Sequence, residues 1–351
     1  MTAATASERR PGATKPRSPQ KAVLSLEWRA WITKNLARGA AADALEGALV
    51  EARVPRLLAR RSIREIESSG VVALLKEESA RTARLENVLA LLRHHTRTTP
   101  LPLRRVATLS KEDLALHYAA NVPFLLTGLV TKWPAFRKWS PAYFAKRYGD
   151  VVVSVAAGRE KDPLYDLHTE TLSREMTMLE LVTRTVAARR SNDLYMVANN
   201  HGIERPELAG LWKDVRFPEW LDPKRLKKHA ALWFGAAGTV TPLHHDQCNI
   251  LFCQIYGRKR VRMLPPTETF LHRGAISMYA AADPDKPDLH AFPEWKHAHV
   301  VDVVVEPGEA LFIPVGWWHH VRSLDVAISF SLTNFRYRND FGAYCPGAIG
   351  S

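Results

Sequence analysis

The feature that most constrains the fold of this chain is a change of residue pattern near position 100. Before it, apolar residues recur mostly at spacings of three and four; after it, short apolar runs alternate with Gly, Pro, Asp and Asn. The first pattern is typical of amphipathic helices and the second of short strands joined by turns. We therefore expect an α-helical region over residues 21–97 and a mainly β domain over residues 101–351.

The second region predicts an antiparallel sandwich or barrel with flanking helices, because its apolar runs are short and closely punctuated by turn residues. Helices are expected at Lys111–Ala120, Pro141–Tyr148 and Met178–Ala188. Strands are expected at Pro123–Thr127, Val151–Val155, Leu194–Val197, Leu232–Phe234, Ile250–Ile255, Val261–Leu264, Val300–Val305, Ala310–Ile313 and Ala327–Leu332.

The chain is basic, with 49 Lys and Arg against 36 Asp and Glu and a formal net charge of +13. Residues 1–20 lack hydrophobic periodicity, so we expect a disordered basic tail there. Such an excess of charge makes nucleic acid a possible partner, but the helical region offers no evident recognition helix, so this partner is not favoured. We expect the helices to pack on the main domain or on a partner, and to carry a homodimer if one forms.

Only three cysteines occur, Cys248, Cys253 and Cys345. An odd and sparse set does not make a disulfide framework, which favours a reducing compartment and a cytoplasmic location. No apolar run approaches the ~20 residues that span a bilayer. No apolar segment follows the N-terminal arginines either, so neither a membrane span nor a signal peptide is expected.

The first segment that predicts a site is Thr239–Asp246, which contains two histidines and an aspartate. On a strand, His244 and Asp246 point to one face and His245 points away. An imidazole beside a carboxylate offers two adjacent ligands for an octahedral metal, and a third ligand would complete the facial triad of a non-haem Fe(II) oxygenase. A hydrogen-bonded core histidine is the alternative interpretation of this pair.

The second segment is Glu306–Arg322, in which a Pro-Gly turn, an apolar strand and another turn precede a histidine pair. His319 and His320 must point to opposite faces of the following strand. His319 shares its face with Val321, whereas His320 shares its face with Arg322. His319 is therefore the candidate for an inward-facing third ligand, with simple packing as the alternative.

The third clue is Lys259, which lies in a run of basic residues. Strand alternation puts Arg258, Arg260 and Arg262 on one face, which we expect to meet solvent, and Lys259, Val261 and Met263 on the other, which we expect to meet the core. A buried ammonium without an anion costs several kcal/mol. A dicarboxylate cosubstrate would supply that anion, and an Asp or Glu partner is the alternative.

Taken together, three motifs resemble the cupin-like branch of the Jumonji-C oxygenases. They are Thr-Pro-Leu-His-His-Asp (241–246), Gln-Ile-Tyr-Gly-Arg-Lys-Arg (254–260) and Pro-Gly-Glu-Ala-Leu-Phe-Ile-Pro-Val-Gly-Trp-Trp-His-His (307–320). These enzymes depend on Fe(II) and 2-oxoglutarate, and the chain is similar to the factor-inhibiting-HIF asparaginyl hydroxylase group. The resemblance covers roughly residues 101–340, and the segment 122–135 resembles the entry strand of such domains.

The resemblance implies a double-stranded β-helix (cupin, jelly-roll) core and assigns roles to single residues. It makes His244, Asp246 and His319 the iron ligands, and it directs Lys259, Thr241 and Tyr195 to the distal carboxylate of 2-oxoglutarate. It places Asn334 near the metal-binding end of the cosubstrate. The family's asparagine six residues after the first histidine is here Ile250, so the role of Asn249 stays open. Ordinary core or strand hydrogen bonding is the alternative for Thr241, Tyr195 and Asn334.

The chemistry that the resemblance implies couples decarboxylation of 2-oxoglutarate with O2 to oxidation of an unactivated C–H bond. Hydroxylation of a protein or peptide side chain is the leading prediction. N-methyl demethylation, oxidation of an RNA base and a non-enzymatic binding function are the alternatives. Trp233, Phe252 and Phe330 are candidates for the wall of the pocket, with core packing as the other interpretation.

Overall fold

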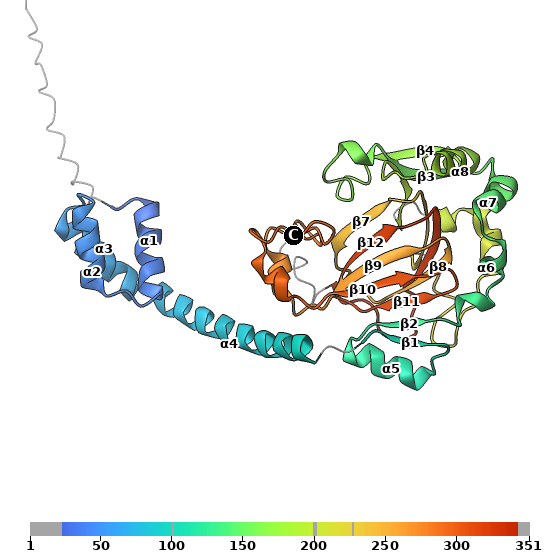
Figure 1. Ribbon diagram of the computed structural model, residues 1–351. Helices are drawn as coiled ribbons and strands as arrows, with labels where there is room; N and C mark the ends of the chain where they lie inside the picture. The colour runs from blue at the N-terminus through green and yellow to red at the C-terminus, as the bar shows by residue number, and fades with distance from the viewer. Residues whose placement is uncertain (1–22, 100–101, 199–201, 227, 343–351) are drawn as a thin grey trace, which may run out of the picture. The chain divides into compact units, whose positions relative to one another are not determined.

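The structure, a computed structural model, describes residues 23–99, 102–198, 202–226 and 228–342 (Figure 1). The chain divides into two compact units, Met1–Ala90 and Leu91–Ser351. The predicted disordered tail, residues 1–20, and Cys345 lie outside the described residues. None of the helices in the described ranges is long and apolar enough to cross a membrane.

The first unit is helical, as the periodicity predicts. It contains α1 (Leu26–Ala37), α2 (Ala42–Glu51), α3 (Arg56–Ser68) and the first part of α4 (Val71–Thr98). The side-chain hydroxyl of Ser25 caps α1 by accepting from the backbone N–H of Trp28. Residues from all four helices, among them Ile32, Leu49 and Val72, form one small core. Arg60 makes a bidentate pair with Glu46 at 2.8 and 3.0 Å, so part of the basic surface is neutralised within the unit.

The second unit is built on two facing β-sheets (Figure 1). The large sheet has the strand order β1-β2-β11-β8-β13-β6-β5-β3-β4, and the small sheet has the order β10-β9-β12-β7. The strands are β1 (Arg104–Val106), β2 (Phe124–Leu126), β3 (Val152–Ala157), β4 (Ser173–Thr177), β5 (Leu194–Met196), β6 (Ala230–Gly235), β7 (Val240–His244), β8 (Ile250–Tyr256), β9 (Lys259–Leu264), β10 (Val301–Val305), β11 (Ala310–Ile313), β12 (Trp318–Ser323) and β13 (Ala327–Leu332).

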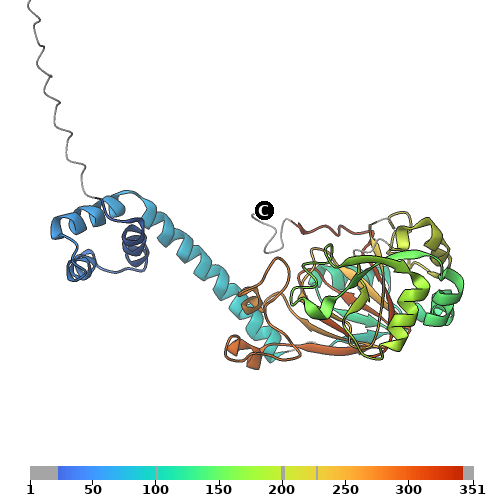
Figure 2. The ribbon, with the colours of Figure 1, turned by 90° about the horizontal axis from the view of Figure 1, so that it is seen from above.

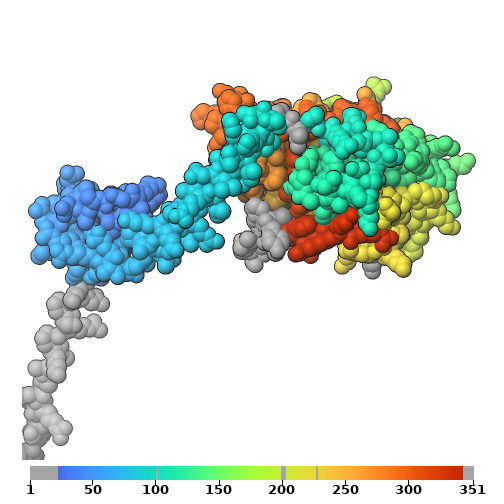
Figure 3. All heavy atoms as spheres, turned by 90° about the horizontal axis from the view of Figure 1, so that it is seen from below, coloured from blue at the N-terminus to red at the C-terminus, as the bar shows by residue number. Residues whose placement is uncertain are grey.

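Helices cover the outer face of the large sheet. They are α5 (Lys111–Ala120), α6 (Pro134–Lys138), α7 (Pro141–Tyr148) and α8 (Met178–Ala187), together with the 3-10 helix η5 (Pro206–Asp214). Figure 2 shows α7 and α8, in green, along this face, and α5, in teal, forms part of the surface in Figure 3. The structure confirms the expected double-stranded β-helix core with flanking helices and an α-helical N-terminal region.

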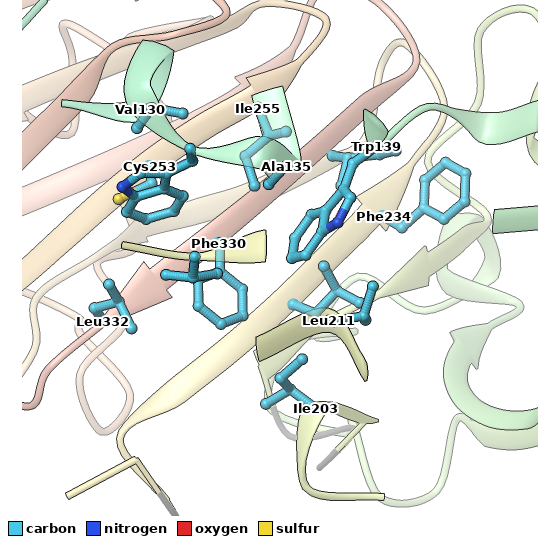
Figure 4. Packing of buried hydrophobic residues seen from close by; sticks show 14 of the residues in the cluster. Val130, Ala135, Trp139, Ile203, Leu211, Phe234, Cys253, Ile255, Phe330 and Leu332 are labelled. Atoms are coloured by element: carbon cyan, nitrogen blue, oxygen red, sulfur yellow. The ribbon is translucent and has the colours of Figure 1, made fainter. Parts of the chain in front are cut away.

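Apolar side chains fill both sides of the large sheet. A first cluster packs Leu125, Phe252 and Leu311 of the large sheet against Val261 and Val321 of the small sheet. A second cluster lies between the large sheet and the helices (Figure 4). Successive side chains of a strand point to opposite faces, so β2, β8 and β11 supply residues to both clusters.

Two strands, β1 and β4, and the parallel pairing of β1 with β2 were not predicted from the sequence. β4 has the residues Ser-Arg-Glu-Met-Thr, of which Met176 alone is buried, because the strand lies at the edge of the large sheet. β1 is a three-residue strand without an apolar run, and it pairs with β2 in parallel, whereas an antiparallel arrangement was expected. Both strands lack the hydrophobic alternation on which the prediction depended.

A tight turn joins β8 to β9 and thereby sets the position of Lys259. Gly257 has a φ of +67°, and a Cβ at this position would overlap the carbonyl oxygen of Val326. The side-chain amide of Gln254 donates to the carbonyls of Tyr256 and Gly257 at 2.8 and 2.7 Å. The turn therefore needs glycine for its left-handed backbone and for the close approach of a neighbouring chain segment.

We predict that Gly257→Ala destabilises the second unit more than Gly158→Ala does. Both positions have positive φ, but a Cβ at Gly158 meets nothing within 4 Å. Gly158→Ala should cost about 1–2 kcal/mol for the backbone alone, and the overlap at Gly257 should add about 1–3 kcal/mol. Urea denaturation of the two variants measures the difference, and equal losses would show that the turn relaxes around the methyl group.

Candidate functional site

The small sheet positions the candidate site through the pairing of β7 with β12. His319 pairs with His244 and Val321 pairs with Thr241, so Pro242 and Leu243 together oppose His320 alone. This two-against-one arrangement is a β-bulge, which shifts the alternation of side chains by one position. Thr241 and His244, which would point to opposite faces of a regular strand, therefore both line the same cavity.

His244, Asp246 and His319 come together as a possible metal site. One ligand atom from each lies within 4.8 Å of the other two. The Asp246 Oδ2 atom is 3.6 Å from His244 Nε2 and 3.2 Å from His319 Nε2. Two imidazole nitrogens and one carboxylate oxygen that converge on one point match the 2-His-1-carboxylate facial triad.

The hydrogen bonds of both histidines prepare their Nε2 atoms as metal ligands. His244 Nδ1 lies 2.7 Å from the carbonyl oxygen of Pro242, and His319 Nδ1 lies 3.0 Å from that of Trp317. A carbonyl oxygen only accepts, so Nδ1 must carry the proton in each ring. The lone pair of each neutral ring is therefore on Nε2, on the side of Asp246.

The protonation states also favour metal binding. Burial lowers the pKa of His244 to about 4, with a further contribution from the neighbouring His319. Burial alone would raise the pKa of Asp246, but the neighbouring imidazoles of His319 and His244 bring it down to about 2. At neutral pH, His244 is a neutral donor and Asp246 is an anion, which are the forms that bind a cation.

The other two histidines of the motifs face away from this site, as predicted. The His245 ring packs against Trp318 with ring centroids 4.6 Å apart, and neither of its nitrogens has a hydrogen-bond partner among the described residues. His320 lies on the opposite face of β12 from His319, with its Nε2 3.7 Å from Asp285. Arg322 also pairs with Asp285, so His320 and Arg322 share the outer face.

Lys259 is buried in the inner face of β9, as the alternation predicts. Its side chain is 1% exposed, and Val261 and Met263 on the same face are fully buried. The ammonium group has no acidic partner in the described part of the chain; Nζ donates to Tyr195 Oη at 2.8 Å. The rings of Tyr195, Trp233 and Phe252 surround Nζ with centroids at 5.3, 5.7 and 5.3 Å. Burial lowers the pKa of Lys259 to about 7.

The arginines that flank Lys259 have acidic partners on the outer side. Arg258 binds Asp325, with 2.8 Å between Nε and Oδ2, and Arg260 and Arg262 both bind Asp302. The Arg262 side chain is 14% exposed, so it is less solvated than predicted, because it also contacts Asp285. The basic run therefore contains three paired cations and one buried cation that lacks a counterion.

Tyr195 and Thr241 lie beside Lys259, where the resemblance placed them. Both line the cavity, and Tyr195 is 2% exposed. Burial raises the pKa of Tyr195, and a hydrogen bond with Thr241 partly offsets this rise. An ammonium, a phenol and a hydroxyl therefore meet in one corner of the cavity, a set of donors that suits a carboxylate.

The structure corrects the prediction for Asn334. Its side-chain amide donates to the carbonyl of Asp222 at 2.8 Å, and Asn334 does not belong to the cavity wall. Alternation along the end of β13 explains the difference: Ser331 and Thr333 face the cavity, so Asn334 points the other way. Asn249 has a structural role, because its Oδ1 accepts from the backbone N–H of Val315 at 2.9 Å.

The three candidate metal ligands and the residues Lys259, Tyr195 and Thr241 line one cavity of about 760 Å³. Trp233 and Phe252 belong to its wall, as expected. Phe330 does not, because it faces the helices and packs with Trp139 and Trp212 (Figure 4). The sequence reasoning missed Tyr279, whose ring stacks on His244 at 5.4 Å, and Asp166, a buried carboxylate in the wall. Both come from segments that carry no motif, so no sequence signal pointed to them.

Comparisons with known proteins agree with this geometry. The model of a family described as a cupin-like domain matches residues 110–342. Lysine-specific demethylase 8 of Xenopus tropicalis is 30% identical over 230 residues, which cover 63% of this chain and 50% of that protein. Lysine-specific demethylase JMJ30 of Arabidopsis thaliana is 29% identical over 230 residues, which cover 61% of this chain and 50% of that protein.

A third relative, HSPB1-associated protein 1 of Homo sapiens, is 37% identical over 123 residues, which cover 33% of this chain and 25% of that protein. The chain thus spans about half the length, or less, of these relatives. The finer resemblance to the asparaginyl hydroxylase group stays a prediction. The family match extends from α5 to the end of the described chain and includes every strand of the site. This chain therefore belongs to the cupin-like domain family.

Proposed function

We propose that this protein uses Fe(II), 2-oxoglutarate and O2 to hydroxylate a side chain of a protein or peptide substrate. The observation that carries the proposal is a single cavity that contains both a His-Asp-His metal site and a buried lysine without a counterion. A dicarboxylate that chelates the metal at one end and meets the lysine at the other end satisfies both features.

His244, Asp246 and His319 would hold the iron through Nε2, a carboxylate oxygen and Nε2. The metal, when bound, supplies the redox chemistry that activates O2. The chain's own part is to fix three ligands on one side, which leaves the other positions for cosubstrate and oxygen. Tyr279 covers one face of His244 and limits the access of water to that ligand.

Lys259, Tyr195 and Thr241 would bind the distal carboxylate of 2-oxoglutarate. The apolar rings around Lys259 exclude water, so the ion pair would form in a medium of low dielectric constant, where it is strong. Burial without an anion is unfavourable for the ammonium group. Cosubstrate binding would therefore relieve a cost that the fold imposes on Lys259.

The reaction balances as follows. One atom of O2 enters succinate as 2-oxoglutarate loses CO2, and the other atom enters a C–H bond of the substrate as an alcohol. Where that carbon is an N-methyl group, the alcohol leaves as formaldehyde and the net reaction is demethylation. The similarity to two lysine-specific demethylases supports this second candidate, and the same residues would serve both reactions.

We predict that His244→Ala abolishes the conversion of 2-oxoglutarate to succinate and weakens Fe(II) binding at least about a hundredfold. His245→Phe is the matched control, because the His245 ring packs in an aromatic cluster and its nitrogens bind no described residue. This variant should keep both properties. If the wild-type protein neither binds Fe(II) nor forms succinate, the oxygenase proposal is wrong and a binding protein becomes the better interpretation.

We predict that the affinity for 2-oxoglutarate falls as the pH rises above 7. Lys259, with its pKa lowered to about 7, loses its proton in this range, whereas the pKa of His244 lies near 4 and does not interfere. The dissociation constant should rise on the order of tenfold between pH 7 and 8.5. Calorimetry with Mn(II)-loaded protein without O2 measures it.

Lys259→Arg is the control for this pH dependence, because a guanidinium stays protonated. Its affinity should be flat over the same range, and Lys259→Met should bind weakly at every pH. An unchanged pH slope in Lys259→Arg would assign the titration to another group.

We also propose that α4 carries a homodimer. Val71, Leu74, Leu85 and Val88 are 49, 66, 58 and 55% exposed, and they follow a heptad spacing in which Glu78 and Arg81 occupy the middle positions. In an antiparallel pair, Leu74 of one copy meets Leu85 of the other, and Val71 meets Val88. Glu78 then faces Arg81, so charge complementarity selects a second copy of this helix as the occupant.

We predict a concentration-dependent dimer that Leu74→Asp with Leu85→Asp converts to a monomer. In such a dimer, the two introduced carboxylates would be buried in the α4 interface without a counterion, which costs free energy of association. Leu57→Asp is the control, because Leu57 is 82% exposed on α3, outside the seam. Light scattering of the full chain gives the mass. A dimer that persists in the double variant would show that this face of α4 does not form the interface. The cytoplasmic location stays a prediction.

A further inference from the structure

Asp246 differs from the other two candidate metal ligands because it lies outside a strand. His244 is the last residue of β7 and His319 belongs to β12, so the pairing of these two strands fixes both histidines. Asp246 lies in the loop of residues 245–249, which joins β7 to β8. A carboxylate on a loop is a precise ligand only if the surrounding structure holds that loop in place. The contacts that hold this loop therefore bear on the metal site.

Asn249, at the end of this loop, joins it to the turn that leads to His319. The Asn249 side chain is buried, and its Oδ1 accepts from the backbone N–H of Val315 at 2.9 Å. The next residue of that turn, Gly316, donates its backbone N–H to the carbonyl of Asp246 at 3.1 Å. Both contacts connect the segment that carries Asp246 with the segment that leads to His319. They fix the positions of the two ligands relative to one another.

Asn339, which lies beyond the end of β13, holds Asn249 in place. Asn339 Oδ1 accepts from the backbone N–H and from the side-chain amide of Asn249 at 2.8 and 2.9 Å, and Asn339 Nδ2 donates to the backbone carbonyl of Asn249 at 2.9 Å. The same side chain also accepts from Tyr118 Oη at 3.0 Å and donates to the carbonyl of Thr333 at 2.9 Å. In such a network each hydrogen bond supports the others, so Asn249 has little freedom to move.

The segment that carries Asn339 is also attached to the second unit away from the site. Arg336 Nε donates to the carbonyl of Glu219 at 2.7 Å. Closer to its end, the segment returns to the loop of Asp246, because the backbone N–H of Phe341 donates to the carbonyl of Gln247 at 3.0 Å. Attachment of the segment and contact with the loop are therefore made by different residues, and they can be tested separately.

We propose that Asn339, acting through Asn249, is a positioning residue that holds Asp246 where this carboxylate binds the metal. The inference rests on the proposed function, because it requires a metal at the His-Asp-His site. Neither Asn249 nor Asn339 belongs to the described wall of the cavity, so their effect reaches Asp246 through the backbone of the loop. Groups that orient a metal ligand in this way typically change metal affinity tenfold to a hundredfold when they are removed.

The test measures the dissociation constant of Mn(II) by calorimetry without O2, together with thermal unfolding of the metal-free full chain. Asn339→Ala should raise the dissociation constant about tenfold. Asn249→Ala should raise it at least as much, and the double variant should match Asn249→Ala within about twofold, because Asn339 acts through Asn249. Arg336→Ala is the matched control. It removes another side-chain hydrogen bond of the same segment, directed to Glu219, and should keep the Mn(II) affinity.

A lower unfolding temperature with unchanged Mn(II) affinity in Asn339→Ala would limit Asn339 to a role in stability and overturn the proposal. Losses of affinity that multiply in the double variant would overturn the route through Asn249. If Asn339→Ala does not fold, Asn339→Asp takes its place, because it keeps the oxygen that accepts three hydrogen bonds. Its added negative charge favours a cation, so weaker Mn(II) binding still supports the proposal, and equal or tighter binding overturns it.

The wild-type protein separates this inference from the proposed function. If the wild type binds no Mn(II), the proposed function is refuted and the positioning role is refuted with it. If the wild type binds Mn(II) and forms succinate while Asn339→Ala binds the metal equally well, the proposed function stands and the positioning role alone is refuted.

Discussion

The site depends on one irregularity, the bulge at Pro242 and Leu243 in β7. A regular strand would send Thr241 and His244 to opposite faces, so the metal ligand and the hydroxyl beside Lys259 could not share a cavity. Proline fits this position because it has no N–H to give to a ladder, and bulges are where strands tolerate it. The carbonyl of Pro242 then orients His244 through Nδ1. One extra residue thus places the ligand and sets its tautomer.

The two faces of the small sheet differ in the partners of their charged side chains. On the outer face, Arg258 binds Asp325, and the arginines of β9 and β12 bind Asp302 and Asp285. The Arg258–Asp325 and Arg260–Asp302 pairs are exposed and contribute little stability each. On the inner face, the phenol of Tyr195 and the rings of Trp233 and Phe252 surround Lys259, which has no acidic partner among the described residues. The net charge of +13 therefore combines surface charge with buried cations, of which Arg159 pairs with Asp166 and Lys259 has no acidic partner among the described residues. Within the described part of the chain, the Lys259 ammonium has no acidic partner and Asp166 Oδ2 has no hydrogen-bond partner, and both residues line the cavity.

Much of the fold could be predicted because its strands alternate strongly or form continuous apolar runs. All nine expected strands overlap observed ones, and α5 and α7 have the expected bounds. Period-two alternation also gave the inward direction of Lys259 and His319, since their neighbours Val261 and Val321 are apolar. The edge strand β4 escaped because a solvated edge needs no apolar residues. Asn334 was misplaced because its role was carried over from a resemblance, whereas the alternation of β13 turns it toward Asp222.

The sequence by itself therefore determined the fold class and the helical first region and predicted the candidate metal ligands, because hydrophobic period and motif order are local properties of the chain. Tertiary structure alone decided that Thr241 and His244 share a face, that Tyr279 covers a ligand, and that Asp166 lies in the cavity with one oxygen free. Those facts depend on the register between strands and on contacts between segments distant in sequence, such as Arg159 with Val240. Which side chains are buried, and which groups they contact, are properties of the assembled fold, and no local sequence pattern encodes them.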